Sequence, residues 1–262
     1  MRSLLGVLFG GLIALGVLTA LWWTEPTRLG VDGLASGDLG DRGTIGRMVR
    51  EYLLANPEVL VEAMQELEKK QDSQRQSGVQ QAIRTYESEL LRDADSPIGG
   101  NPDGDVTIVE FNDYQCPYCK QAFPAIEAVA KADGKVRIVY KDLPILGEAS
   151  RVAALAALAA QRQGKHHGFH KAVMEFKGRL DRARVLELAA SVGIDVLQLE
   201  NDMEDQKLRQ VIERNMSLAD ALGVRGTPAF VIGDRFVPGA VDVDTLRQLI
   251  AEARSSRGRP KQ

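Results

Sequence analysis

The chain has few cysteines, few histidines and no surplus of positive charge. Its 262 residues include two cysteines and three histidines, and the formal net charge is −3. Two cysteines cannot build a disulfide framework, so a hydrophobic core must stabilise the fold and both thiols are left for function. The lack of a basic surplus argues against a nucleic-acid partner. Three clustered histidines are too few for a distributed metal site.

The composition that remains is that of a globular protein, with 44% hydrophobic and 26% charged residues. Its length accommodates one domain with extensions, or two modest domains. The two cysteines stand together in Cys116-Pro117-Tyr118-Cys119, after an apolar run at 106–111 and before helix-compatible residues at 120–130. This order places both thiols on the turn between a buried strand and a helix, which favours reversible dithiol–disulfide exchange.

The position of each thiol predicts its role in that exchange. The reactive species is the thiolate, and a helix N-terminus lowers a thiol pKa through unpaired backbone N–H groups and the helix dipole. Cys116 lies at the helix start, so we expect it to be the nucleophile that forms a mixed disulfide. Cys119 lies one turn deeper, and we expect it to resolve that disulfide. Pro117 and Tyr118 are uncharged, so any tuning comes from their geometry and polarity.

A metal site is the main alternative for a Cys-x-x-Cys pair. His166-x-x-x-His170 could supply the other half of a Cys₂His₂ pattern, but 46 residues separate Cys119 from His166. Zinc fingers separate the two halves by about 12–15 residues. We therefore expect no metal ligands here, and we expect the histidines to be surface or packing groups.

The N-terminus carries an export signal. After Arg2, residues 4–23 contain no charged residue and end in Trp22-Trp23. A cleaved signal peptide needs a shorter apolar region and an Ala-x-Ala-like site, whereas a membrane-spanning helix needs about 20 apolar residues. The length favours an uncleaved transmembrane anchor over a cleaved signal peptide at 1–23. In both cases the rest of the chain is exported to an oxidising compartment, the periplasm or cell envelope.

Residues 24–43 are rich in glycine and predict a flexible linker. A helical region follows at 44–96, where Asn56-Pro57-Glu58 is typical of a helix restart. Apolar residues at helical spacing form two groups, within 45–67 and 79–90, separated by an almost wholly polar stretch at 69–78. One interpretation is a helical hairpin folded on the next domain. We favour a self-association stalk with two apolar patches joined by a hinge.

The remaining chain predicts an α/β domain at 97–254. Strands are expected at 106–111 and 135–141, separated by a helix of the right length for a βαβ unit. Helical segments at 148–163, 166–176, 181–191 and 195–222 form an insertion at about 148–222. A hairpin at 229–237 and a helix at 242–254 complete the domain, and 255–262 is a loose polar tail.

Gly226-Thr227-Pro228 stands directly before the expected strand at 229–232. A trans-proline turn is the ordinary interpretation of this tripeptide, since about 5–6% of X–Pro bonds are cis. The functional interpretation is a cis-proline loop that faces the thiols and leaves the Thr227 backbone for a bound peptide. We therefore regard Thr227 and Pro228, with Pro117 and Tyr118, as candidate substrate-binding residues.

Three motifs together resemble the DsbA-like thiol:disulfide oxidoreductases: EFNDYQCPYC at 110–119, KDLPILG at 141–147 and GTPAF at 226–230. The resemblance covers about 97–254 and implies a thioredoxin fold with a helical insertion. It implies that Cys116 attacks, that Cys119 resolves, and that a cis-proline at Pro228 helps to bind the substrate peptide. It also implies no cofactor beyond the redox-active Cys116–Cys119 disulfide.

A buried acid six residues before the first cysteine recurs in that family, and Glu110 occupies this place. An acid inside an apolar strand has a raised pKa and could accept the Cys119 proton, which makes Glu110 a third catalytic candidate. The alternative is a surface carboxylate at a strand end.

Residues 44–92 are similar to the N-terminal extension of the ScsC (suppressor of copper sensitivity) branch, some members of which oligomerise and act as isomerases. The resemblance implies a homo-oligomer, such as a trimer, formed through 44–92. Its partners would be unfolded or misfolded exported proteins and a membrane redox partner. Oxidase and isomerase or reductase action share one active site, and the stalk favours the isomerase. The alternative function is a copper(I)-binding, copper-tolerance protein of the envelope that uses the same two thiolates.

Overall fold

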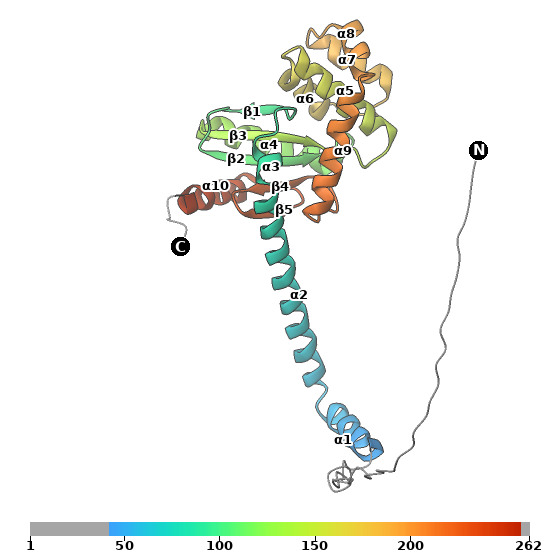
Figure 1. Ribbon diagram of the computed structural model, residues 1–262, viewed down its shortest axis with the longest axis vertical. Coiled ribbons are helices and arrows are strands. Elements are labelled where there is room, and N and C mark those ends of the chain that lie inside the picture. The colour runs from blue at the N-terminus through green and yellow to red at the C-terminus, as the bar shows by residue number, and fades with distance from the viewer. Residues whose placement is uncertain (1–41, 258–262) are drawn as a thin grey trace, which may run out of the picture. The chain divides into compact units, whose positions relative to one another are not determined.

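The computed structural model describes residues 42–257 (Figure 1). The signal or anchor predicted at 1–23, most of the linker at 24–43 and the end of the polar tail lie outside the described residues. Within 42–257 no helix is both long and apolar enough to cross a membrane. The chain divides into two compact units, Met1–Met64 and Gln65–Gln262.

The described part of the first unit holds α1 (Arg42–Ala55) and the beginning of α2 (Glu58–Thr85). The break falls at Asn56-Pro57, where the Asn56 backbone N–H and side-chain amide both donate to the Tyr52 carbonyl at 2.8 Å. Pro57 cannot donate a backbone hydrogen bond, so the chain restarts a helix there as expected. An N-terminal patch of apolar side chains is exposed on these helices: Ile45, Met48, Val49, Tyr52, Leu60, Val61 and Met64.

The hinge expected at 69–78 is absent, because α2 continues through this polar stretch without a break. The Lys, Gln and Arg residues of this stretch are good helix formers, and the single Gly78 costs only about 1 kcal/mol relative to alanine. The second apolar group does not form a free patch either. Ile83 and Leu90 are buried against Val109 and Phe111 of the sheet in the same unit, so this part of the expected association surface is used internally.

The sheet of the second unit has the strand order β1-β3-β2-β4-β5. Its central pair, β2 (Val106–Asn112) and β3 (Val136–Asp142), is parallel and is connected through α4 (Pro117–Asp133). The strands β4 (Ala229–Ile232) and β5 (Arg235–Pro238) form the antiparallel hairpin beside β2. A short edge strand, β1 (Ile98–Gly100), pairs with β3 at the start of the domain, where no strand was expected.

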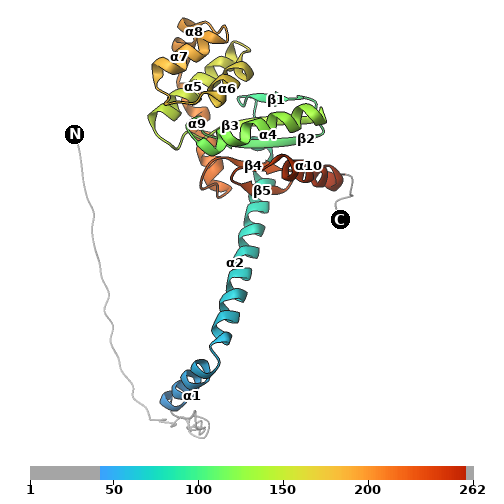
Figure 2. The same ribbon diagram turned by 180° about the vertical axis from the view of Figure 1, so that it is seen from behind.

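Helices cover both faces of this sheet. On one face lie α4 and α10 (Val243–Arg257), and Figure 2 shows α4 across β2 and β3. On the other face the end of α2, α3 (Glu87–Leu91) and α9 (Gln206–Ala221) bury Leu90, Leu218 and Leu222. The closing helix ends three residues later than expected, so 255–257 are helical rather than a loose tail.

The insertion between β3 and β4 contains α5 (Glu148–Arg162), α6 (His166–Glu175), α7 (Arg182–Ser191), α8 (Val196–Met203) and α9. Its alanine-rich α5 is buried along most of its length. The segment expected to be helical throughout 195–222 breaks at Glu204-Asp205, because the Asp205 side chain accepts the Lys207 backbone N–H and caps a new helix. The expected thioredoxin fold with a helical insertion is confirmed.

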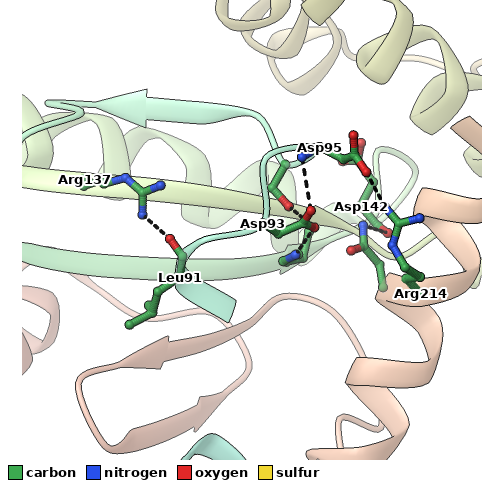
Figure 3. A network of polar contacts seen from close by, with 9 residues as sticks. Leu91, Asp93, Asp95, Arg137, Asp142 and Arg214 are labelled. Atoms are coloured by element: carbon green, nitrogen blue, oxygen red, sulfur yellow. Dashed lines mark hydrogen bonds and ion pairs between the residues drawn. The ribbon is translucent and has the colours of Figure 1, made fainter. Parts of the chain in front are cut away.

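Polar contacts fasten the segment after α3 to the sheet (Figure 3). The Arg137 guanidinium donates to the Leu91 carbonyl at 2.9 Å, and Lys141 pairs with Asp93 at 2.7 Å. Arg214 of α9 pairs with Asp95. Lys141 is buried, so its ammonium group depends on this carboxylate for charge compensation.

Replacing Leu90 by alanine should destabilise the protein by about 2–4 kcal/mol, because it leaves a cavity between α3 and the sheet. Leu67→Ala on the exposed part of α2 is the matched control and should change the free energy of unfolding by less than about 0.5 kcal/mol. Urea unfolding followed by circular dichroism measures both values. Equal effects of the two substitutions would contradict the packing described for Leu90.

Candidate active site

The redox turn is built by the start of α4. Cys116 is the N-cap residue of this helix, Pro117 occupies its first position, and Cys119 lies within the first turn. Both cysteines are free thiols and both are buried, Cys119 completely. Tyr118 between them is 62% exposed and faces solvent. Cys116 lies at the helix start as the sequence predicted, but its side chain makes no capping hydrogen bond to the first N–H groups of α4.

Asp113 holds the loop that leads into this turn, a role that the sequence analysis missed. Its backbone carbonyl accepts the Cys116 N–H at 3.0 Å. Its buried carboxylate accepts the Gln115 N–H at 2.8 Å, the Ser150 hydroxyl at 2.6 Å and the Leu146 N–H at 3.0 Å. The helical insertion therefore positions the redox turn through one carboxylate. An aspartate three residues before the cysteine, with a serine early in the next helix, was the available signal.

The loop before β4 brings the second part of the site to Cys116. The Thr227–Pro228 peptide bond is cis, which is the functional rather than the ordinary interpretation of that tripeptide. The Cys116 thiol donates to the Thr227 carbonyl at 3.1 Å. In this reduced form the carbonyl is therefore engaged by the nucleophile itself, and a peptide that bound there would replace this contact.

Glu110 lies in β2 beneath α4 and is 1% exposed, so the alternative of a surface carboxylate is wrong. Burial raises its pKa to about 8, and the negative charges of Asp142 and Glu127 add to this effect. Burial also raises the pKa of the Cys119 thiol strongly, with a further contribution from the charge of Glu110. Cys119 therefore needs a proton acceptor before it can attack, and Glu110 is close enough for the two groups to influence each other.

Further buried polar side chains surround Glu110, and the sequence analysis did not identify them as a group. Asn112 of β2 and Asp142 of β3 lie on the same face of the sheet as Glu110. The Tyr114 hydroxyl is 2.9 Å from Nδ1 of His170 in α6, and both groups are buried. The alternation along each strand puts 110 with 112 and 140 with 142, but only the pairing of the two strands shows that both sets share one face.

Two of the three histidines are packing groups, while His167 is exposed. Burial lowers the pKa of His166 to about 3 and moves that of His170 well below its ordinary value, so both rings are neutral at physiological pH. Within 42–257 no group of three or more His, Cys, Asp or Glu side chains is placed to hold a metal ion.

A hollow of about 480 Å³ opens beside the redox turn between α4 and the end of α6. Pro117 and Phe123 line it from α4, and Met174 and Phe176 line it from the insertion. At its rim the Lys120 ammonium group donates to the Phe176 carbonyl at 2.7 Å. Its apolar walls lie next to the cysteine pair, where a client side chain beside the reacting disulfide would be accommodated.

Replacing Glu110 by glutamine should stabilise the reduced protein, and the gain should grow with pH. A carboxyl group with a pKa of about 8 in the folded state, against an ordinary 4.5, holds its proton more tightly when folded. Its ionisation therefore lowers stability as the pH rises from about 4.5 to about 8. Glutamine removes this cost, so the free energy of unfolding should rise by about 1–3 kcal/mol at pH 8 and little at pH 4.

Urea unfolding of wild type and Glu110→Gln at the two pH values measures this difference. Glu62→Gln, which changes an exposed carboxylate on α2, is the control and should show no such trend. A Glu110→Gln effect of equal size at both pH values would contradict a buried carboxyl group that is protonated near neutrality.

Known protein families match two parts of the chain, the α/β domain and the N-terminal helices. Residues 107–251 match the model of the DSBA-like thioredoxin domain. Residues 41–74 match the Copper resistance protein ScsC N-terminal domain. The first match contains both cysteines and the cis-proline, and the second contains the exposed N-terminal patch.

Among solved structures, a thioredoxin-like oxidoreductase from Silicibacter pomeroyi is 46% identical, with a TM-score of 0.63. The match covers 64% of this chain and 97% of that protein. The catalytic domain of Proteus mirabilis ScsC is 32% identical with a TM-score of 0.63, over 67% of this chain and 98% of that domain.

The Na(+)/H(+) antiporter NhaA 1 of Salinispora arenicola is a curated relative with 30% identity over 167 residues. The match covers 63% of this chain but 26% of the antiporter. The chain thus spans about a quarter of the length of this relative.

Proposed function

Because the chain belongs to the DsbA-like family of thiol:disulfide oxidoreductases, we propose that it exchanges disulfides with exported client proteins through Cys116 and Cys119. The observation that carries this proposal is the placement of the Cys116 thiol. It lies at the N-terminus of α4 and 3.1 Å from the carbonyl of Thr227, beside the cis-proline Pro228. A nucleophilic sulfur is thus held next to backbone that can pair with a peptide.

The exchange begins when the Cys116 thiolate attacks one sulfur of a client disulfide. A bond forms between Cys116 and that sulfur, the client S–S bond breaks, and the second client sulfur leaves as a thiolate. Cys119 then loses its proton and attacks the Cys116 sulfur, which releases the first client sulfur as well. Two electrons pass to the client, and Cys116 and Cys119 end as a disulfide.

Isomerisation follows from the same intermediate when a client thiolate attacks the mixed disulfide before Cys119 does. No electrons are transferred in total, and Cys116 returns to its reduced form. The burial and high pKa of Cys119 slow its attack and give the client time to rearrange. This supports the isomerase or reductase direction, with a membrane redox partner that keeps the dithiol reduced. The cysteine pair itself carries the electrons, so the exchange needs no bound cofactor.

The proposal includes export to the periplasm or cell envelope, and assembly into a homo-oligomer such as a trimer. The exposed N-terminal patch supports assembly, because apolar side chains on two successive helices remain uncovered within their own unit. The association surface is narrower than the sequence suggested, since Ile83 and Leu90 are buried on the sheet. Several active sites in one assembly would face one misfolded client, which suits an isomerase.

Copper(I) binding by the two thiolates is a second candidate, supported by the match of residues 41–74 to a domain named for copper resistance. Two soft thiolates can bind copper(I). The described residues place no further His, Cys, Asp or Glu ligands around them, and the raised pKa of Cys119 opposes the thiolate form. Disulfide exchange is therefore the better supported function.

Replacing Cys116 by alanine should abolish both reactivation of scrambled ribonuclease and oxidation of a reduced client. Cys119→Ala is the matched variant, because it retains the nucleophile and removes only the resolving thiol. It should accumulate a mixed disulfide with the client, seen as a band of higher mass on a non-reducing gel. Full activity of Cys116→Ala in both assays would refute disulfide exchange.

Replacing Val49 by glutamate in the N-terminal patch should dissociate the oligomer, because the new charge would be buried in the interface. Arg50→Glu places the same charge on the next residue along α1 and is the matched control. Light scattering of the purified variants should give a lower mass for Val49→Glu than for Arg50→Glu. A wild-type protein that is monomeric at all concentrations would end the assembly proposal.

A further inference from the structure

The active-site face of the sheet holds a second buried acid besides Glu110. In the parallel pairing of β2 with β3, Glu110 is opposite Tyr140 and Asn112 is opposite Asp142. Side chains two residues apart in a strand point to the same face, so Glu110 and Asp142 are diagonal neighbours beneath the redox turn. Both are 1% exposed, and the side chains of Asn112 and Tyr114 lie beside the Asp142 carboxylate.

Among residues 42–257, no cationic side chain is found to act on these two acids. From β3 comes Tyr140, from the loop before Cys116 come Asp113 and Tyr114, and from α4 come Cys119 and Glu127. From α6 come His166 and His170, whose rings burial keeps neutral. The nearest lysine in sequence, Lys141, belongs to the opposite face of β3 and pairs with Asp93.

Two carboxylates in one apolar region without a cation cannot both ionise at neutral pH, since each charge raises the cost of the other. Burial raises the pKa of Asp142 to about 7, and the charge of Asp142 is among the causes that raise the pKa of Glu110 to about 8. The pair therefore titrates as a unit, and its first ionisation falls near the working pH.

We propose that Asp142 is a positioning residue of the redox site, which shares one proton with Glu110 so that the pair takes up the Cys119 proton in the resolving step. This inference rests on the proposed disulfide exchange. When the shared proton is on Asp142, Glu110 is ionised and faces the buried thiol. The S–H bond of Cys119 then breaks, the proton passes to the Glu110 carboxylate, and the Cys119 sulfur displaces the client thiolate from Cys116.

The proton taken up in this step leaves both acids neutral. The buried site then carries no charge after the disulfide has formed, which removes the cost of a buried carboxylate. Loss of that proton to solvent restores the singly charged pair for the next turnover. Asp142 thus keeps Glu110 basic enough to accept a proton at neutral pH, which a lone carboxylate with an ordinary pKa does poorly.

Carbon-13 NMR of side-chain carboxyl groups in the reduced protein tests the coupling without any client. In Asp142→Asn the pKa of Glu110 should fall by about one unit or more, and in Glu110→Gln the pKa of Asp142 should fall likewise. Glu62→Gln removes an exposed carboxylate on α2 and should shift neither. An unchanged Glu110 titration in Asp142→Asn would overturn the proposal.

The second readout is the pH dependence of the resolving step, measured as release of client thiol from a preformed mixed disulfide at Cys116. Asp142→Asn should move the midpoint of this profile to lower pH by the same amount as the Glu110 titration. Asp142→Glu retains the charge and should return the midpoint towards wild type. A purely structural role would lower the rate at every pH without moving the midpoint, and that outcome would overturn the proposal.

If Asp142→Asn does not fold, the titration of Asp142 in Glu110→Gln decides the question, and a pKa as high as in wild type would count against the coupling. Failure of the proposed function is a different result. It would appear as disulfide exchange by Cys116→Ala, whatever the carboxyl titrations show.

Discussion

The register between the parallel strands β2 and β3 determines the chemistry of this site. It places Glu110 and Asp142 on the face that α4 covers and turns Lys141 to the opposite face, where Asp93 compensates its charge. A shift by one residue would exchange these faces and bring a lysine beneath Cys119. The nucleophile depends on the same register, because α4 begins directly after β2 and its N-terminus holds Cys116 at the end of that strand.

Desolvation separates the two thiols into different roles. Both sulfurs are buried, but the Cys116 thiol at the start of α4 donates to the Thr227 carbonyl, while Cys119 lies deeper and is influenced by the charge of Glu110. We therefore expect Cys116 to meet a client first, whereas Cys119 needs a proton acceptor before it can attack. Asp113 fixes the position of the loop before Cys116, because its carboxylate accepts hydrogen bonds from Leu146 and Ser150. The helical insertion thus helps to position the redox turn as well as packing against the domain.

Local turn and periodicity signals predict the strand–turn–helix around Cys116 and the insertion. The cis form before Pro228 was implied by the family resemblance, since the tripeptide alone favours a trans bond. The sequence could also place Glu110, since an acid within an apolar strand stands out. It could not reveal Asp142, because this residue follows Lys141 in a strand whose facing depends on pairing with a partner 30 residues away. The sequence also could not assign roles to the two apolar groups within 45–67 and 79–90. Helical spacing alone does not tell whether an apolar stripe packs on the sheet of the same chain or on another copy.

The contacts at the end of α2 and in α3 show the role of the second apolar group. Ile83 and Leu90 meet the apolar face of β2 and β3, and Lys141, Arg137 and Arg214 fasten the segment that follows. The end of α2 and α3 thereby cover the sheet face opposite the thiols, whereas the side chains of the N-terminal patch stay exposed. Association through that patch would engage residues outside the catalytic sheet. The redox site could then work in each subunit without rearrangement of its core, while assembly decides only how many sites meet one client.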